Sequence, residues 1–278
     1  MDLEITQVKR IVVKVGTSTL TYPNGLLNLR RIERFVRVLS DLKNMGKEIV
    51  LVTSGAIGVG VGKIGLPERP RDIQSKQALA AVGQVELMDM YDRQFSQYNH
   101  TIAQVLLTRD IMENESRCAH CRNTFSRLLE YGVVPVVNEN DTVSTHEIQF
   151  GDNDRLSAIV AALVGADLLI LLSDIDGLYS DDPRRNPQAE FISQVKEITP
   201  QLMEMGKGTA GSDVGTGGMA AKLAAARIAT DSGSDMIIAN GGNVEVIHEI
   251  MQGMPRGTLF MAHENLDFDL MDYINYQY

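Results

Sequence analysis

The sequence has 278 residues, 44% of them hydrophobic, which is enough to fill the core of one large α/β domain or two small ones. Its formal net charge of -10 excludes a general nucleic-acid surface, which would need an excess of Lys and Arg. There is no signal-peptide stretch at the amino terminus and the longest aliphatic run, around 168–172, is too short to span a membrane, so we expect a cytoplasmic protein with no membrane partner.

Short aliphatic runs alternate with helical segments along the chain. The expected strands are 10–15, 48–53, 101–107, 133–137, 168–172 and 235–239. The expected helices are 28–45, 73–97, 119–131, 154–164, 219–231 and 244–252. Residues 180–195 are expected to form a turn and a small antiparallel excursion. Alternation of this kind predicts a three-layer α/β/α sandwich around a mostly parallel central sheet.

No linker, repeat or low-complexity tract divides the chain. We therefore expect a single domain, residues 1–278, with one lobe at 1–163 and a second at 164–262. Residues 263–278 are polar, acidic and rich in tyrosine, and we expect a partly disordered tail there.

The first expected strand ends in a lysine. In an open α/β sheet, ligands bind at the carboxyl ends of the strands, so residues at these ends are informative. Ile11, Val13 and Val15 would share one face of the strand, which leaves Lys14 on the other face. A lysine in a central strand is costly unless it reaches an anion or water. Lys14 is thus either an anion ligand or a lysine that reaches solvent from an edge strand.

The second strand is followed by a turn at Ser54 and Gly55, whose backbone N–H groups suit a carboxylate or a phosphate. Gly60, Gly62 and Gly65 match GxGxxG by spacing, but they do not open the helix after the first strand. We therefore reject a dinucleotide-binding site at these glycines.

Two cysteines, Cys118 and Cys121, form a CxxC sequence. A zinc site needs about four ligands, and there is no second cysteine pair. We expect free thiols with an incidental structural role.

Polar residues gather at two further junctions. Asn138, Glu139, Asn140 and Asp141 follow the fourth strand, and Asp152, Asn153 and Asp154 lead into a helix. A helix N-cap would explain one of these residues but not all of them. The cluster could hold an ammonium group, orient lysines or bind Mg²⁺ through water. Residues 142–152 would then form a hairpin or a lid over the site.

The last junction is GTGGMAAK at residues 215–222, a glycine-rich turn that precedes a helix. The side chain of Lys222 in the first helical turn would lean back over this turn and over any phosphate held there. The sequence contains no GxxxxGK[ST] motif, so a P-loop is not supported. Ser173 and Asp174 end a further strand. Phosphoryl transfer needs mainly positioning and charge neutralisation, which two such lysines would supply.

Taken together, these junctions resemble the amino-acid kinase family. The matching motifs are VVKVGTS at 12–18, TSGAIGVG at 53–60, VVNENDTV at 136–143, GDND at 151–154, SDIDGLY at 173–179 and GTGGMAAK at 215–222. The resemblance covers nearly the whole chain, and NENDTV followed by GDND is most similar to the glutamate 5-kinase group of the family.

The resemblance implies ATP-dependent phosphorylation of the γ-carboxylate of L-glutamate to L-glutamyl 5-phosphate, the first step of proline biosynthesis. Matching positions imply that Lys14 and Lys222 stabilise the transferring phosphoryl group, with Asp154 holding both lysines. The glutamate-binding positions are Ser54, Gly55, Asp141 and Asn153. The nucleotide-binding positions are Lys14, Ser173, Asp174, Thr216, Gly217, Gly218, Met219, Ala220, Ala221 and Lys222.

A glutamate side chain is already ionised at pH 7, so this reaction requires no general base. ATP with Mg²⁺ is the implied cofactor, and no residue is assigned as a direct metal ligand. The resemblance also implies a homodimer or tetramer and suggests proline as a feedback inhibitor. Many members of the group continue into a PUA domain, and this sequence ends before one, so we expect a kinase-only form.

Two alternatives remain at the level of the sequence. One is another amino-acid kinase, for example one that acts on acetylglutamate. The other is a non-catalytic nucleotide-binding protein with the same fold, which would be expected to lose Lys14, Lys222 or Asp154. All three residues are present.

Overall fold

The computed structural model describes residues 7–109, 113–144, 153–183, 186–207, 218–254, 256–263, 265 and 267–275. An eight-stranded sheet runs through the molecule in the order β3-β4-β2-β1-β5-β9-β10-β8. Its strands, in chain order, are β1 Arg10–Lys14, β2 Glu48–Val52, β3 Ile102–Leu107, β4 Val134–Glu139, β5 Leu168–Ser173, β8 Gln194–Val195, β9 Asp235–Asn240 and β10 Thr258–Phe260. Neighbouring strands are parallel except for β9 and β10. The mostly parallel sheet predicted from the sequence is confirmed.

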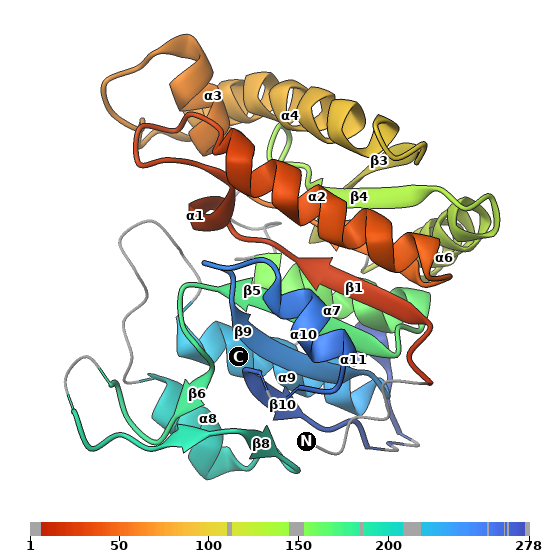
Figure 1. Ribbon diagram of the computed structural model, residues 1–278, viewed down its shortest axis with the longest axis vertical. Coiled ribbons are helices and arrows are strands. Elements are labelled where there is room, and N and C mark those ends of the chain that lie inside the picture. The colour runs from red at the N-terminus through yellow and green to blue at the C-terminus, as the bar shows by residue number, and fades with distance from the viewer. Residues whose placement is uncertain are drawn as a thin grey trace.

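Helices cover both faces of this sheet (Figure 1). One face packs against α2 Leu29–Asn44, α4 Ile73–Ser96 and α10 Val246–Met251. The other face packs against α6 Glu115–Glu130, α7 Asn153–Val164 and α9 Met219–Asp231. The remaining described helices are α1 Thr17–Leu20, α3 Ala56–Ile64, α8 Pro200–Lys207 and α11 Leu270–Asn275. The three-layer α/β/α sandwich is thus confirmed.

The side chains of β1, and of Val15 directly after it, divide between the two cores as the sequence predicts. Ile11, Val13 and Val15 are buried on the face of α2 and α10, whereas Val12 is buried on the face of α7 and α9. Side chains alternate along a strand, so Lys14 falls on the same side as Val12. The pattern of three valines and one isoleucine therefore directs this lysine toward α7 and α9.

The two halves of the chain lie at opposite ends of the molecule, with the first half in red to yellow-green and the second in green to blue (Figure 1). Strands β1 and β5 pair in parallel between them, so one continuous sheet joins the two halves. Strands β6 Leu178–Tyr179 and β7 Phe191–Ile192 form a separate antiparallel pair, which matches the excursion expected near residues 180–195.

Helix α3 was not predicted, because its sequence AIGVGVGKI is rich in glycine, a poor helix former. Its packing against α4 explains why it forms. A Cβ added to Gly83 of α4 would lie 1.8 Å from the carbonyl oxygen of Ala56, and one added to Gly60 would lie 2.0 Å from that of Leu79. The two helices approach so closely that only glycine fits at these positions, and tertiary packing outweighs propensity.

From the sequence, no helix is expected at residues 270–275, which lie within the expected tail. They form α11, in which Leu270 and Ile274 are buried against α7 and its neighbours. The segment is mostly polar, so Leu270 and Ile274 are not identified from the sequence as core residues. They are four residues apart and so share one helix face. Within the described part of the chain, no helix combines the length and apolar character needed to cross a membrane.

Candidate active site

Three charged side chains from distant parts of the sequence meet at the carboxyl edge of the sheet. Asp154, in the first turn of α7, places Oδ1 2.5 Å from the Nζ of Lys14 and Oδ2 3.0 Å from the Nζ of Lys222. Lys14 ends β1 and Lys222 lies in the first turn of α9. All three side chains are buried. The structure therefore brings together the three residues that the sequence indicated separately.

Electrostatics keep this carboxylate ionised. Burial by itself would raise the pKa of Asp154, but the nearby ammonium groups of Lys14 and Lys222 outweigh burial and hold the pKa below its ordinary value. Two ammonium groups and one carboxylate give the three side chains a formal sum of one positive charge. A buried group of this kind favours an anion beside it.

Glycines occupy the turns that follow β1 and β2, near the end of the strand that carries Lys14. A Cβ added to Gly16 would lie 3.7 Å from the Nζ of Lys14, so the missing side chain keeps the approach to this ammonium group open. Gly55 has a φ of 98°, and a Cβ on it would lie 3.2 Å from Cγ2 of Thr17. A residue with a side chain would be strained at this position, so glycine allows the turns after β1 and β2 to pack together.

An amide network lies next to the charged group. The Nδ2 of Asn153, the residue before Asp154, donates to Thr53 O at 2.6 Å, to Ser54 Oγ at 2.9 Å and to Asn138 Oδ1 at 2.8 Å. Asn138 in turn donates to Gln84 Oε1 at 2.9 Å. Helices α7 and α4, strand β4 and the turn after β2 are tied together at this point, and Ser54 and Asn153 are in direct contact.

Asp141 lies on the turn after β4. Burial raises the pKa of the Asp141 carboxyl to about 6, against the opposing effect of the Arg69 charge. A carboxylate that is costly to ionise alone is well suited to receive a cationic partner. The lid expected at 142–152 falls mostly at 145–152, outside the described residues.

Of the predicted nucleotide positions that the structure describes, Ser173 and Asp174 lie at the carboxyl end of β5, and residues 218–222 lie at the amino end of α9. Ser173 ends β5 with its side chain partly exposed, and Asp174 beside it is exposed. Gly218 is the extended N-cap of α9, and its carbonyl accepts from the backbone N–H of Lys222 at 3.3 Å. Met219, Ala220 and Ala221 form the first turn of this helix. Thr216 and Gly217 lie outside the described residues.

The features that we set aside in the sequence have structural explanations. Gly60 and Gly62 lie within α3 and Gly65 caps its carboxyl end, so they form no phosphate turn after β1. Cys118 and Cys121 are free thiols on α6, and burial raises the pKa of both. Thiols of this kind are poor nucleophiles at neutral pH.

Gln84 and Asn138 are site residues that our assignment from the sequence left out. From the sequence, Asn138 is placed in the polar cluster, but no role is assigned to it. Gln84 lies among buried positions of α4 that include Ala80, Leu87 and Tyr91. A glutamine on the buried stripe of a helix needs a hydrogen-bonding partner, and this was the available signal.

A metal ion held directly by the protein would need several acidic, histidine or cysteine ligands close together. Among the described residues, no group of three or more His, Cys, Asp or Glu side chains is arranged to hold one. The lysines, the open turn at Gly16 and the amide network fit a phosphate group next to a small polar acceptor.

Comparisons with known proteins point to one family. The profile described as "Amino acid kinase family" matches residues 9–240. A glutamate 5-kinase of Clostridium perfringens is 58% identical over 91% of this chain and 96% of its own length. A glutamate 5-kinase of Clostridium tetani is 54% identical over 93% of this chain and 96% of its own length. The crystal structure of UMP kinase from Ureaplasma parvum has a TM-score of 0.65 at 14% identity, covering 92% of this chain and 99% of its own, and this likeness shows the fold alone.

Proposed function

The chain belongs to the amino acid kinase family, and we propose that it catalyses the ATP-dependent phosphorylation of the γ-carboxylate of L-glutamate to L-glutamyl 5-phosphate, the first step of proline biosynthesis. The observation that carries this proposal is the position of Asp154 and Asn153. These consecutive residues contact two different groups, the lysine pair and the amide network. A phosphoryl site and an acceptor site would thus be fixed side by side by one turn of α7.

In the proposed reaction, an oxygen of the glutamate γ-carboxylate attacks the γ-phosphorus of ATP. The bond from this phosphorus to the bridging oxygen breaks, and ADP leaves. Lys14 and Lys222 would neutralise charge on the transferring phosphoryl group, while Asp154 fixes their positions. Because the attacking carboxylate is already ionised at pH 7, no side chain has to remove a proton.

The nucleotide would lie along the edge formed by Ser173, Asp174 and the amino end of α9. Backbone N–H groups at a helix amino terminus suit phosphate oxygens, and α9 begins in Gly218, Met219, Ala220 and Ala221 with no acidic residue in its first turn. Mg²⁺ would arrive bound to ATP, since it retains waters and phosphate ligands and needs few protein ligands. When bound, it would offset part of the negative charge of the triphosphate.

Glutamate would lie against Ser54, Gly55, Asp141 and Asn153. The free α-ammonium group of glutamate would pair with the Asp141 carboxylate, which is otherwise buried at a cost. An N-acetylated substrate has no ammonium group and would leave this carboxylate without a cationic partner. This difference favours glutamate over acetylglutamate.

Several further properties belong to the same proposal and are supported by the likeness to the glutamate 5-kinase group. We place the enzyme in the cytoplasm as a single kinase domain with lobes at 1–163 and 164–262, assembled as a homodimer or tetramer. Proline, the end product of the pathway, would act as a feedback inhibitor.

The test is to incubate the purified protein with MgATP and, in separate reactions, L-glutamate, N-acetylglutamate, aspartate or UMP. ADP release and trapping of the acyl phosphate with hydroxylamine are measured. We expect a hydroxamate with glutamate and little with the other acceptors. The proposal is wrong if no glutamate-dependent hydroxamate forms, and preference for another acceptor would identify a different member of the family.

A further inference from the structure

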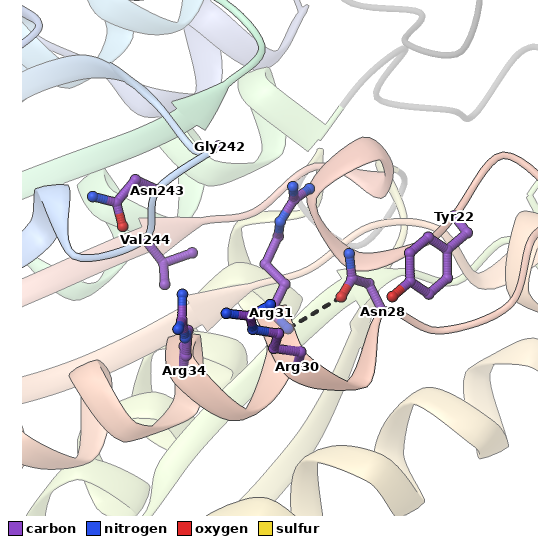
Figure 2. Close-up of a pocket in the computed structure, with 8 residues that line it drawn as sticks. All are labelled: Tyr22, Asn28, Arg30, Arg31, Arg34, Gly242, Asn243 and Val244. Atoms are coloured by element: carbon purple, nitrogen blue, oxygen red, sulfur yellow. Dashed lines mark hydrogen bonds between the residues drawn. The ribbon is translucent and has the colours of Figure 1, made fainter.

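A cavity lies away from the lysine pair, between α2 and the loop that follows β9. Its volume is about 340 Å³, within the range of small-molecule sites. Figure 2 shows its two walls, with α2 on one side and the loop carrying Gly242, Asn243 and Val244 on the other. The residues that line it are Tyr22, Asn28, Arg30, Arg31, Arg34, Gly242, Asn243 and Val244.

Three of these lining residues are arginines, and none is acidic. Among the described residues, neither Arg30 nor Arg34 forms an ion pair. Arg31 donates from Nη1 to the carbonyl oxygen of Ser18 at 3.2 Å. Among the described residues, no carboxylate forms an ion pair with this guanidinium group either. In a protein of net charge -10, three arginines that face one cavity without an acidic partner there form a local positive site.

The arginines are also poorly placed for the stability of α2. Helix α2 begins after its N-cap Asn28, so Arg30 and Arg31 occupy the first turn, where the helix dipole disfavours positive charge. Arg34 is four residues after Arg30 and three after Arg31, so both pairings set like charges against each other. Binding an anion would relieve both effects, because the backbone N–H groups of this turn and the guanidinium groups all favour negative charge.

The opposite wall connects the cavity to the predicted nucleotide edge. The backbone N–H of Gly241 donates to Ser173 O at 2.7 Å, and Gly242 N donates to Asn240 Oδ1 at 2.8 Å. On the α2 side, the Ser18 carbonyl that Arg31 contacts lies in α1, four residues after Lys14. The cavity is therefore separate from the Lys14–Asp154–Lys222 group, but its walls contact the turn that follows β1 and the end of β5.

We propose that this cavity, lined by Arg30, Arg31 and Arg34, is a binding site for a small multivalent oxyanion that carries phosphate or carboxylate groups. The planar guanidinium group binds both kinds of oxygen acid through paired N–H donors. Asn28 and Asn243 add amide groups to the wall, and Tyr22 adds an aromatic ring. A bound anion would join α2 to the β9–α10 loop and so tie the two halves of the chain together.

The experiment is isothermal titration calorimetry of the protein with pyrophosphate and, separately, with citrate. Both titrations use a Lys222→Met background, which weakens competing anion binding at the lysine pair. We expect saturable binding of at least one anion, and the stronger of the two identifies the favoured chemistry. The double substitution Arg30→Gln and Arg34→Gln should weaken that binding by about tenfold or more, the expected effect of losing charge-assisted hydrogen bonds.

The matched control is Arg37→Gln, which removes one exposed arginine of α2 that does not line the cavity. It should leave the affinity nearly unchanged. Circular dichroism checks that the double variant is folded, and the single variants Arg30→Gln and Arg34→Gln replace it if it is not. Equal affinity of the parent and the cavity variants, or no saturable binding by the parent at millimolar anion, would overturn the proposal. Because binding is measured without turnover, this result is independent of the substrate assignment.

Discussion

Lys222 Nζ lies 3.0 Å from Oδ2 of Asp154, and both side chains are buried between α7 and α9. The same carboxylate contacts Lys14 through its other oxygen. The consequences of removing a lysine and of removing the aspartate should therefore differ. Asp154 keeps its contact with Lys14 when Lys222 is lost, whereas both lysines lose the carboxylate that they share when Asp154 is lost.

Replacement of Lys222 by methionine should reduce kcat by roughly 10²–10³, the scale for loss of one charge-stabilising group in a transition state. Asp154 retains Lys14, so the free energy of unfolding should change little. Steady-state kinetics with glutamate and urea denaturation measure the two effects. Turnover equal to that of the unaltered protein would remove Lys222 from the mechanism.

Asp154→Ala should lower the free energy of unfolding by about 3–5 kcal/mol at neutral pH, because two buried ammonium groups lose their carboxylate. The pKa of Asp154 is lower in the folded than in the unfolded protein, so its stabilising effect is present above about pH 4 and is lost as the pH falls further. The difference in free energy of unfolding between the unaltered protein and Asp154→Ala, measured by urea denaturation, should therefore become smaller below about pH 4. If this difference in free energy of unfolding stays constant down to about pH 3, the assigned ion pairs are contradicted.

The elevated pKa of Asp141 predicts a pH dependence for glutamate. The ionised form is needed to pair with the α-ammonium group, so kcat/KM for glutamate should fall as the pH drops through about 6. The side chain of free glutamate has an ordinary pKa near 4.3 and does not titrate in this range. The pH profile of Asp141→Asn should be low and should lack this inflection. If the variant keeps the same inflection, another group is responsible.

The close approach of α3 and α4 can be tested at Gly83. Alanine there would place Cβ 1.8 Å from the carbonyl oxygen of Ala56, and the resulting displacement should cost about 3 kcal/mol or more. The control is Gly58→Ala in α3, where Cβ would lie 3.6 Å from Cγ2 of Thr17 in ordinary contact. That change should be neutral or stabilising by up to about 1 kcal/mol. Thermal or urea unfolding of the two variants decides whether the contact is as close as described.

The carboxyl-terminal helix α11 should contribute to global stability. Ile274 is buried, and its carbonyl oxygen accepts from Arg109 Nη2 at 3.0 Å and from Arg155 Nη2 at 3.4 Å. Ile274→Ala should lower the free energy of unfolding by about 2–5 kcal/mol. Asp272→Ala, an exposed change on the same helix, should stay within about 0.5 kcal/mol. Similar values for the two variants would mean that α11 is not packed as described.

The six longer strands could be predicted to within about two residues because their signal is local. A run of aliphatic residues between helical segments indicates a strand buried on both faces, whatever its partners are. Helix α3 and helix α11 could not be predicted in this way. The first depends on the contact of Gly60 and Gly83 across two helices, and the second on the burial of Leu270 and Ile274 against α7.

Hydrophobic periodicity and glycine turns act over short distances, so the fold class and the residue types at each strand end can be predicted without knowledge of the contacts between distant segments. Which of these strand ends meet depends on how those distant segments pack. The parallel pairing of β1 with β5 and the packing of α7 against α9 place Lys14 and Lys222 on the two oxygens of Asp154. The Arg30–Arg34 cavity has the same origin, since its second wall comes from a loop more than two hundred residues away in the chain, which no local pattern can indicate.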